Sequence, residues 1–250
     1  MITAEQYRKI SNKYGYVASW AIWDKAGDKP KSNISNMDVF NNNNNSELLS
    51  ILTTDVIMVG LNLSRNIRLE KPFMNFHDKN PYGNDFKVRY AFENTPYYGA
   101  YMTDIIKNLA MTSSKKVLAY IKDKPEILKK QIIDFRNEMK FIQSTKPIII
   151  AFGKDVYNIL YKHLNENEYT SLIQVTHYSH QISKEKYRKE IHGKLNIIPP
   201  NTEVLISVKK KLKAINTVID GTEISSNADK YTMQKLIELT NELLNKLNSK

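Results

Sequence analysis

Four short apolar runs separated by longer amphipathic stretches limit the folds that this chain can adopt. The runs cover residues Asp55–Leu61, Gly99–Ile105, Ile148–Phe152 and Leu172–Thr176. Short continuous apolar runs are typical of strands that are buried on both faces, as in a parallel sheet. Because strands that alternate with helices bury their faces in layers, we expect an α/β fold. The predicted architecture is a three-layer sandwich with a central, mainly parallel four-stranded sheet flanked by helices.

The segments around these runs carry helix signals. After Pro125, apolar residues recur at helical spacing, namely Leu128, Ile132, Phe135, Met139 and Ile142. A second helix is expected from Gly153 to about His163, and Ser183 is the expected N-cap of a third over Lys184–Ile191. Residues 46–52 and 233–247 also have helical patterns, and the five asparagines at 41–45 predict a polar surface loop.

Length and composition favour one folded domain. With 250 residues, of which 41% are hydrophobic, the chain can bury a sizeable core. We expect a single domain over residues 1–250, with a core over about residues 55–191 and extensions 1–54 and 192–250 packed on it. No apolar run approaches the roughly 18 residues of a membrane span, and residues 1–10 lack the apolar region of a signal peptide. A cytoplasmic protein with no membrane partner is therefore expected.

The absence of cysteine excludes several kinds of chemistry. A chain without cysteine forms no disulfide, thiolate zinc site or iron–sulfur cluster, and it has no cysteine nucleophile. The sequence also lacks the Gly-x-x-x-x-Gly-Lys-Ser/Thr and Gly-x-Gly-x-x-Gly motifs of phosphate-binding enzymes. We expect neither a metal nor an organic cofactor.

The charge balance points to a polyanionic partner. Lysine and arginine number 37 against 26 acidic residues, which gives a formal net charge of +11. Such an excess favours nucleic acid or an anionic membrane, and no basic amphipathic helix argues for the membrane. The alternative is a codon bias toward lysine that has no bearing on binding.

Polar residues follow the predicted strands. Asn62 and Ser64 follow the first strand, Asp104 ends the second, Gly153 ends the third and His177 follows the fourth. Each signal alone is weak, since a strand-end glycine is common and a lone histidine is more often structural. Because the carboxyl ends of parallel strands meet at one edge of a sheet, where ligands bind, the four together predict a functional site.

This ordered set resembles the uracil-DNA glycosylase superfamily over roughly residues 55–191. Gly60-Leu61-Asn62 is similar to its Gly-x-Asp/Asn water-positioning motif, in an Asn form that resembles the mismatch/thymine-DNA glycosylase branch. Asp104 stands where the family has an Asn that reads the base, and His177-Tyr178-Ser179 is similar to its His-Pro-Ser motif. Two residues depart from the pattern, because Leu63 and Tyr178 each replace a proline.

The resemblance implies a monofunctional DNA glycosylase, which hydrolyses the N-glycosidic bond of a flipped-out base and leaves an abasic site. His177 would stabilise the departing base by donating to its O2. Asn62 would position the attacking water, although a neutral amide cannot take its proton. Each has a structural alternative, Asn62 as a cap of the following turn and His177 as a satisfied strand-end histidine. A chain that kept this fold without the chemistry would be a nucleic-acid-binding protein.

The resemblance also implies contacts to the flipped base and to DNA. An aromatic ring stacks on the base, and the candidates are Phe76 and Phe73, with a place in the core as the alternative for either. The wedge that replaces the base in the duplex is expected at Gln181 or Ile182. Candidates for phosphate contacts and for a basic surface beside them are Ser64, Arg65, Ser179, Lys184, Lys186 and Arg188.

Two positions bear on which base is excised. Ser64 stands where uracil-specific relatives carry a bulky Tyr against the pyrimidine 5-position, so a 5-substituent has room. Asp104 as a carboxylate only accepts hydrogen bonds and suits the N4 amine of cytosine; protonated in a dry pocket, it would donate to N3. We therefore expect the excised base to be a 5-modified cytosine. Restriction of phage DNA that contains such bases would be a fitting role for the protein. The alternative is that Asp104 is a strand-end cap and the substrate is uracil or a deaminated mismatch in base-excision repair.

Overall fold

The computed structural model describes residues 2–24, 34–41, 46–64, 69–78, 83–107, 109, 111–197 and 238. The chain divides into two compact units, Met1–Asn196 and Ile197–Lys250. Nearly all of the second unit, including the helix expected over residues 233–247, lies outside the described residues, as do residues 42–45. That the C-terminal extension packs on the core as part of one domain stays a prediction.

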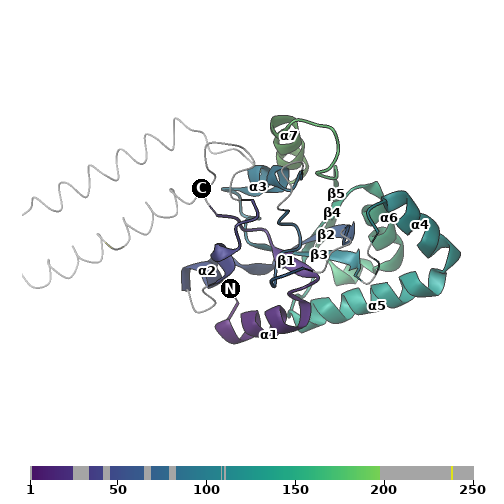
Figure 1. Ribbon diagram of the computed structural model, residues 1–250, viewed down its shortest axis with the longest axis horizontal. Helices are drawn as coiled ribbons and strands as arrows, with labels where there is room; N and C mark the ends of the chain where they lie inside the picture. The colour runs from purple at the N-terminus through teal and green to yellow at the C-terminus, as the bar shows by residue number, and fades with distance from the viewer. Residues whose placement is uncertain are drawn as a thin grey trace, which may run out of the picture. The chain divides into compact units, whose positions relative to one another are not determined.

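The first unit is built on a five-stranded sheet with the order β1-β3-β2-β4-β5 (Figure 1). The four expected strands are β2 (Thr53–Asn62), β3 (Ala100–Ile106), β4 (Ile148–Phe152) and β5 (Ser171–Val175). They pair in parallel, and Ile57, Met58 and Val59 at the centre of β2 are completely buried. The α/β fold with a mainly parallel sheet is therefore confirmed.

The expected number of strands is one too low. The fifth strand, β1 (Ala18–Trp20), pairs antiparallel with β3 and comes from the N-terminal extension. Its three residues are all buried, and so short a run carries no periodicity from which a strand can be predicted. The N-terminal extension is thus part of the sheet and covers the outer edge of β3.

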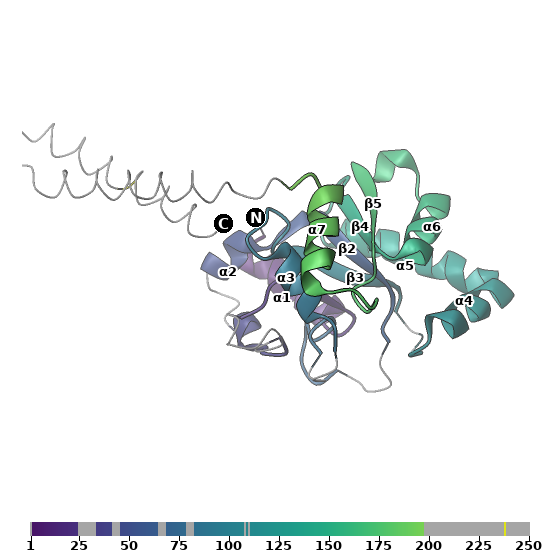
Figure 2. The same cartoon turned by 90° about the horizontal axis from the view of Figure 1, so that it is seen from above.

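Helices cover both faces of the sheet and make the three layers (Figures 1 and 2). On one face, α3 (Phe86–Phe92) packs against α7 (Lys184–Lys194). On the other face lie α4 (Ser114–Asp123), α5 (Pro125–Phe141) and α6 (Lys154–His163). The other helical elements within the described residues of this unit are α1 (Ala4–Tyr14), α2 (Ser46–Ile51) and the 3-10 turns Asp38–Phe40 and Glu166–Glu168.

The strongest helix signals are confirmed. Helix α5 begins at Pro125, α6 begins after Gly153, and the Ser183 hydroxyl caps α7 by accepting from the backbone N–H of Lys186 at 3.3 Å. Gly153 has a φ of +97°, a conformation that favours glycine, so the glycine at the end of β4 makes the turn into α6. Helices α1, α3 and α4 are not among those expected, because they lie where the sequence pattern is mixed with aromatic and polar residues.

A buried polar cluster joins β3 to α5. Glu138 is completely buried, and its Oε1 accepts hydrogen bonds from the hydroxyls of Tyr101 at 2.8 Å and Thr103 at 2.9 Å. The ammonium of Lys107 lies 2.6 Å from Glu138 Oε2 and also donates to the carbonyl of Asp104. Burial and the neighbouring Glu138 raise the pKa of Tyr101 well above its usual value. This cluster holds the carboxyl end of β3 against α5.

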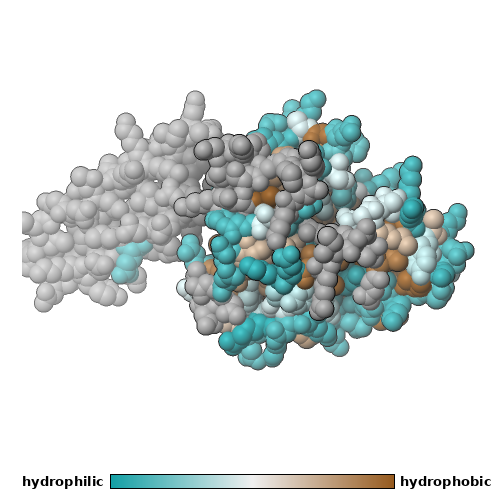
Figure 3. Space-filling model, in the orientation of Figure 1, coloured by the Kyte–Doolittle hydropathy of each residue, from teal (hydrophilic) through white to brown (hydrophobic). Residues whose placement is uncertain are grey.

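The surface in Figure 3 is mostly hydrophilic, with hydrophobic residues in small separate areas. Among the described residues, the large hydrophobic side chains that are most exposed are Tyr16, Ile133 and Tyr161. No helix within the described part of the chain is long and apolar enough to cross a membrane.

Candidate functional site

A pocket of about 430 Å³ opens at the carboxyl edge of the four parallel strands. It is lined by residues in the last part of each strand or directly after it, with Asn62 at the end of β2, Asp104 near the end of β3, Gly153 after β4 and His177 after β5. The structure thus brings together six of the predicted residues, Asn62, Ser64, Phe76, Asp104, His177 and Ser179. They meet because parallel strands deliver their carboxyl ends to the same edge.

Gly60 is what allows Asp104 to face this pocket. The two residues are partners across the β2–β3 pairing, and a Cβ atom at position 60 would collide with Asp104 Oδ1 and touch the ring of Phe76. Asp104 is 3% exposed, and its Oδ2 accepts a hydrogen bond from Asn75 Nδ2 at 2.9 Å. Gly60 therefore makes room for the carboxylate of Asp104 on the neighbouring strand β3.

The orientation of the Asn62 amide is fixed by backbone carbonyls. Its Nδ2 lies 2.8 Å from the Met111 carbonyl, 3.1 Å from that of Leu109 and 3.3 Å from that of Leu63. Only an NH₂ group can donate to these oxygens, so Oδ1 is the atom of this amide that can accept a hydrogen bond. Asn62 thus ties the loop after β3 to the end of β2 and, at the same time, can hold a water through Oδ1.

His177 is held as a neutral donor. Its Nδ1 accepts from the backbone N–H of Ser179 at 3.1 Å and lies 2.8 Å from the Ser179 hydroxyl. A nitrogen that accepts carries no proton, which places the ring proton on Nε2. Burial lowers the pKa of His177 to about 4, so the ring is uncharged at neutral pH. Ser179 therefore orients His177, and its expected contact to phosphate stays a prediction.

Aromatic rings form one wall of the pocket. Phe76 lies 6.4 Å from Phe152, which meets Tyr178 edge-on at 5.5 Å. Tyr178 stacks on His177 with ring centroids 4.3 Å apart. It stands where the superfamily that the sequence resembles has a proline. Phe76 has a φ of +64°, an uncommon conformation for a bulky residue, and Phe73 in the same loop has one of +65°.

The expectation that Phe73 contacts the base is wrong. Phe73 is 1% exposed and packs in the core against Tyr7, Trp20 and Phe40, with ring centroids 5.3, 6.3 and 5.6 Å away. Its carbonyl accepts a hydrogen bond from Ser19 in β1. Two phenylalanines in one loop are equivalent in sequence, and only the N-terminal extension, which covers Phe73, distinguishes them.

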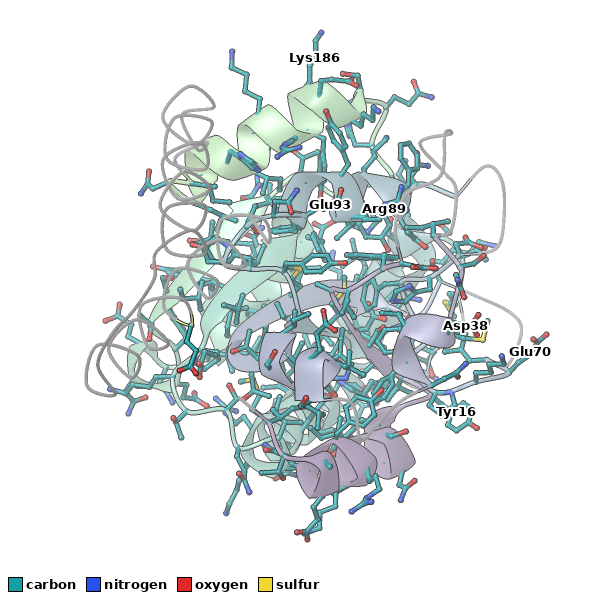
Figure 4. All side chains as sticks on the ribbon, turned by 90° about the vertical axis from the view of Figure 1, so that its left-hand side faces the viewer. Tyr16, Asp38, Glu70, Arg89, Glu93 and Lys186 are labelled. Atoms are coloured by element: carbon teal, nitrogen blue, oxygen red, sulfur yellow. The ribbon has the colours of Figure 1, made fainter. Side chains whose placement is uncertain are left out.

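Of the expected DNA-contacting residues, Ser64 and Ser179 line the pocket, whereas the others that the structure describes do not, namely Gln181, Ile182, Lys184, Lys186 and Arg188. Gln181 is exposed and Ile182 half-buried in the turn after His177, where Lys87 Nζ donates to the carbonyl of His180 at 2.9 Å. The charged ends of Lys184 and Arg188 lie over the ring of Tyr90 on α3, at 4.6 and 5.1 Å. Figure 4 shows Lys186 pointing away from the body of the protein, and Arg65 lies outside the described residues.

Several lining residues were not predicted. They come from the two connections that precede α3 and α4 and from the starts of α4 and α6, namely Asn75, Asp78, Asn84, Asp85, Thr112, Ser114 and Asp155. Within one of these connections, the backbone N–H of Asp78 donates to Asp85 Oδ2 at 2.9 Å. No sequence pattern marks these positions, because they reach the pocket through loops. Within the described ranges, no three His, Asp or Glu side chains are grouped so as to hold a metal ion.

The fold and the pocket define the class of protein. It is an α/β protein with a polar pocket at the carboxyl ends of its parallel strands, where a neutral histidine, a fixed asparagine and a buried aspartate meet. Neither a protein-family model, nor a curated protein, nor a solved structure matches the chain.

Proposed function

We propose that the protein is a DNA glycosylase that hydrolyses the N-glycosidic bond of a base flipped into the pocket. The observation that carries the proposal is that one pocket holds both a neutral His177 whose proton is on Nε2 and an Asn62 whose amide is fixed with Oδ1 available. His177 can donate a hydrogen bond to a departing base, and Asn62 can accept one from an attacking water.

The two side chains match the two halves of the reaction. When the bond between C1′ and the base breaks, its electron pair leaves with the base, and the sugar takes on oxocarbenium character. A hydrogen bond from His177 Nε2 to the pyrimidine O2 stabilises the negative charge on the base. Water held by Asn62 Oδ1 adds to C1′, and its proton passes to solvent and finally to the released base, because an amide cannot accept it.

The pocket also supports the expected choice of base. A volume of about 430 Å³ falls in the range of roughly 300–1,000 Å³ that ordinarily takes ligands larger than a bare pyrimidine. Phe76 offers a ring for stacking, Ser64 leaves the 5-position open, and Asp104 presents carboxylate oxygens to an exocyclic amine. We infer a 5-modified cytosine as the substrate, with restriction of modified phage DNA as the role.

The test is release of free bases from DNA, measured by mass spectrometry. Duplex and single-stranded oligonucleotides each carry one uracil, cytosine, 5-methylcytosine or 5-hydroxymethylcytosine, and cleavage of the abasic product by alkali gives a second readout. We expect release of a 5-substituted cytosine, with a loss of about 100-fold or more in His177→Ala and Asn62→Ala, the cost of removing one preorganised group.

The matched control is His180→Ala, three residues after His177 with an exposed side chain. It should retain the full rate. Uracil release alone would indicate a repair enzyme, whereas unchanged DNA binding without release of any base would indicate a nucleic-acid-binding protein.

A further inference from the structure

Asn75 holds Asp104 in a defined arrangement that the sequence did not predict. It lies on the connection between β2 and α3, is 4% exposed and lines the pocket. Its Nδ2 donates to Asp104 Oδ2 at 2.9 Å and to the carbonyl of Val17 at 3.2 Å. Both hydrogens of the amide are thereby used, and the orientation of the amide is fixed, because its oxygen could bond neither partner.

The contact also defines how Asp104 is used. Asn75 Nδ2 donates to Asp104 Oδ2, so this carboxyl oxygen acts as a hydrogen-bond acceptor. With its NH₂ turned to Asp104 and Val17, Asn75 has Oδ1 as its remaining polar atom, and this oxygen also only accepts. The two neighbouring residues thus present acceptors to a ligand in the pocket.

We propose that Asn75 is a specificity-determining residue, which together with Asp104 forms an acceptor pair for the exocyclic amine of the excised base. The inference rests on the proposed function and narrows it to bases with an amino group at position 4. An amine has two hydrogens for the two acceptors. A 4-oxo base such as uracil or thymine would place its own acceptor against them, and polar groups left unpaired in a site built for hydrogen bonds are strongly discriminated against.

The test compares two bases that share the 5-substituent and differ at C4, which carries an amine in one and an oxygen in the other, and at N3, which carries a proton only in the 4-oxo base. Oligonucleotides of one sequence carry either 5-hydroxymethylcytosine or 5-hydroxymethyluracil, and the ratio of kcat/KM for the two bases is measured. The wild-type protein should favour the amino base by about 100-fold or more. Asn75→Leu, which has a similar volume and neither donor nor acceptor, should lower the ratio at least about tenfold, the effect of one lost hydrogen bond to a charged group.

A second variant gives a readout that a merely structural role would not move. Asn75→Asp places two carboxyl groups side by side, which raises the pKa of the pair. At low pH the new carboxyl is protonated and donates to Asp104 again. The preference of this variant for the amino base should therefore be greater at low pH than at high pH, and the wild-type ratio measured at the same pH values is the reference.

Calorimetric titration of the two free bases separates failure of this inference from failure of the proposed function. If the protein releases neither base but binds free 5-hydroxymethylcytosine better than 5-hydroxymethyluracil, the acceptor pair stands and the glycosylase proposal falls. Equal binding of the two bases, no binding of either, or a wild-type ratio retained in both Asn75 variants would overturn the inference.

Discussion

Two buried carboxyl groups lie on opposite faces of β3 and differ in their surroundings. Glu138 approaches the face that carries Tyr101 and Thr103, and two hydroxyls and the Lys107 ammonium close around it. Asp104 points to the other face, since side chains alternate along a strand, and there it meets Asn75 and a pocket. Both are nearly inaccessible to solvent.

Their surroundings separate a structural carboxyl group from a candidate functional one. Burial alone does not distinguish them. Glu138 is enclosed by donors that belong to the fold, and a loss of its charge would leave a buried ammonium without its counterion. Asp104 lies at the wall of a cavity large enough for a ligand. The first group should therefore matter for stability and the second for recognition.

The largest effect is expected for removal of the carboxyl group in the core. Glu138→Ala should lower the free energy of unfolding by about 3–5 kcal/mol, the usual cost of breaking a buried ion pair from one side. Urea unfolding followed by circular dichroism measures it. A loss below about 1 kcal/mol would mean that the cluster is no more than a surface-like ion pair.

Asp104→Asn should show the opposite pattern. The shape is kept, and the oxygen of the new amide can still accept from Asn75, so the free energy of unfolding should change by less than about 1 kcal/mol. Release of the amino base should fall about 100-fold because an acceptor is replaced by a donor. The rate of uracil release should rise relative to that of the amino base. Single-turnover kinetics on both bases measure this. An unchanged rate and preference would place Asp104 with Glu138 as a structural group.

The pH dependence should report the other titratable group of the pocket. Burial lowers the pKa of His177 to about 4, and a proton on Nδ1 would displace the Ser179 N–H that orients the ring. Base release should therefore persist from pH 7 down to about pH 5 and fall near pH 4. Unfolded histidine binds a proton near pH 6.5, so this residue makes the folded state less stable as the pH falls from about 6.5 toward 4, and its effect vanishes above that range. Glutamine does not titrate, so the difference between the pH profiles of the wild-type protein and His177→Gln isolates the contribution of His177 to base release and to stability. A profile that falls near pH 6.5 would contradict it.

The smallest effect is expected on the outer surface. Lys186→Ala should leave base release at saturating DNA unchanged and reduce the slope of log K against log salt by about 1, the contribution of one phosphate contact. Fluorescence anisotropy at several salt concentrations measures it. Lys140→Ala on α5, exposed on the other side of the sheet, is the matched control and should keep the wild-type slope. Equal slopes in both variants would remove α7 from the DNA surface.

Much of the fold and the centre of the site follow from local sequence. The strands β2 to β5 and the helices α5 to α7 are where the apolar periodicity and the caps predict them, because burial on one or both faces leaves a pattern within a few residues. Asn62, Asp104 and His177 could be predicted as neighbours without knowledge of the loops. Parallel pairing alone brings strand ends together.

The residue pattern thus predicts the layered α/β architecture and the edge at which polar side chains converge. It does not predict that β1 joins the sheet, that Phe76 and not Phe73 faces the pocket, or that Asn75 pairs with Asp104. These three features depend on contacts between residues far apart in the chain. Asn75 bonds Val17 across 58 positions and Asp104 across 29, and such pairings depend on how the N-terminal extension packs, which leaves no periodic trace in the residues on either side.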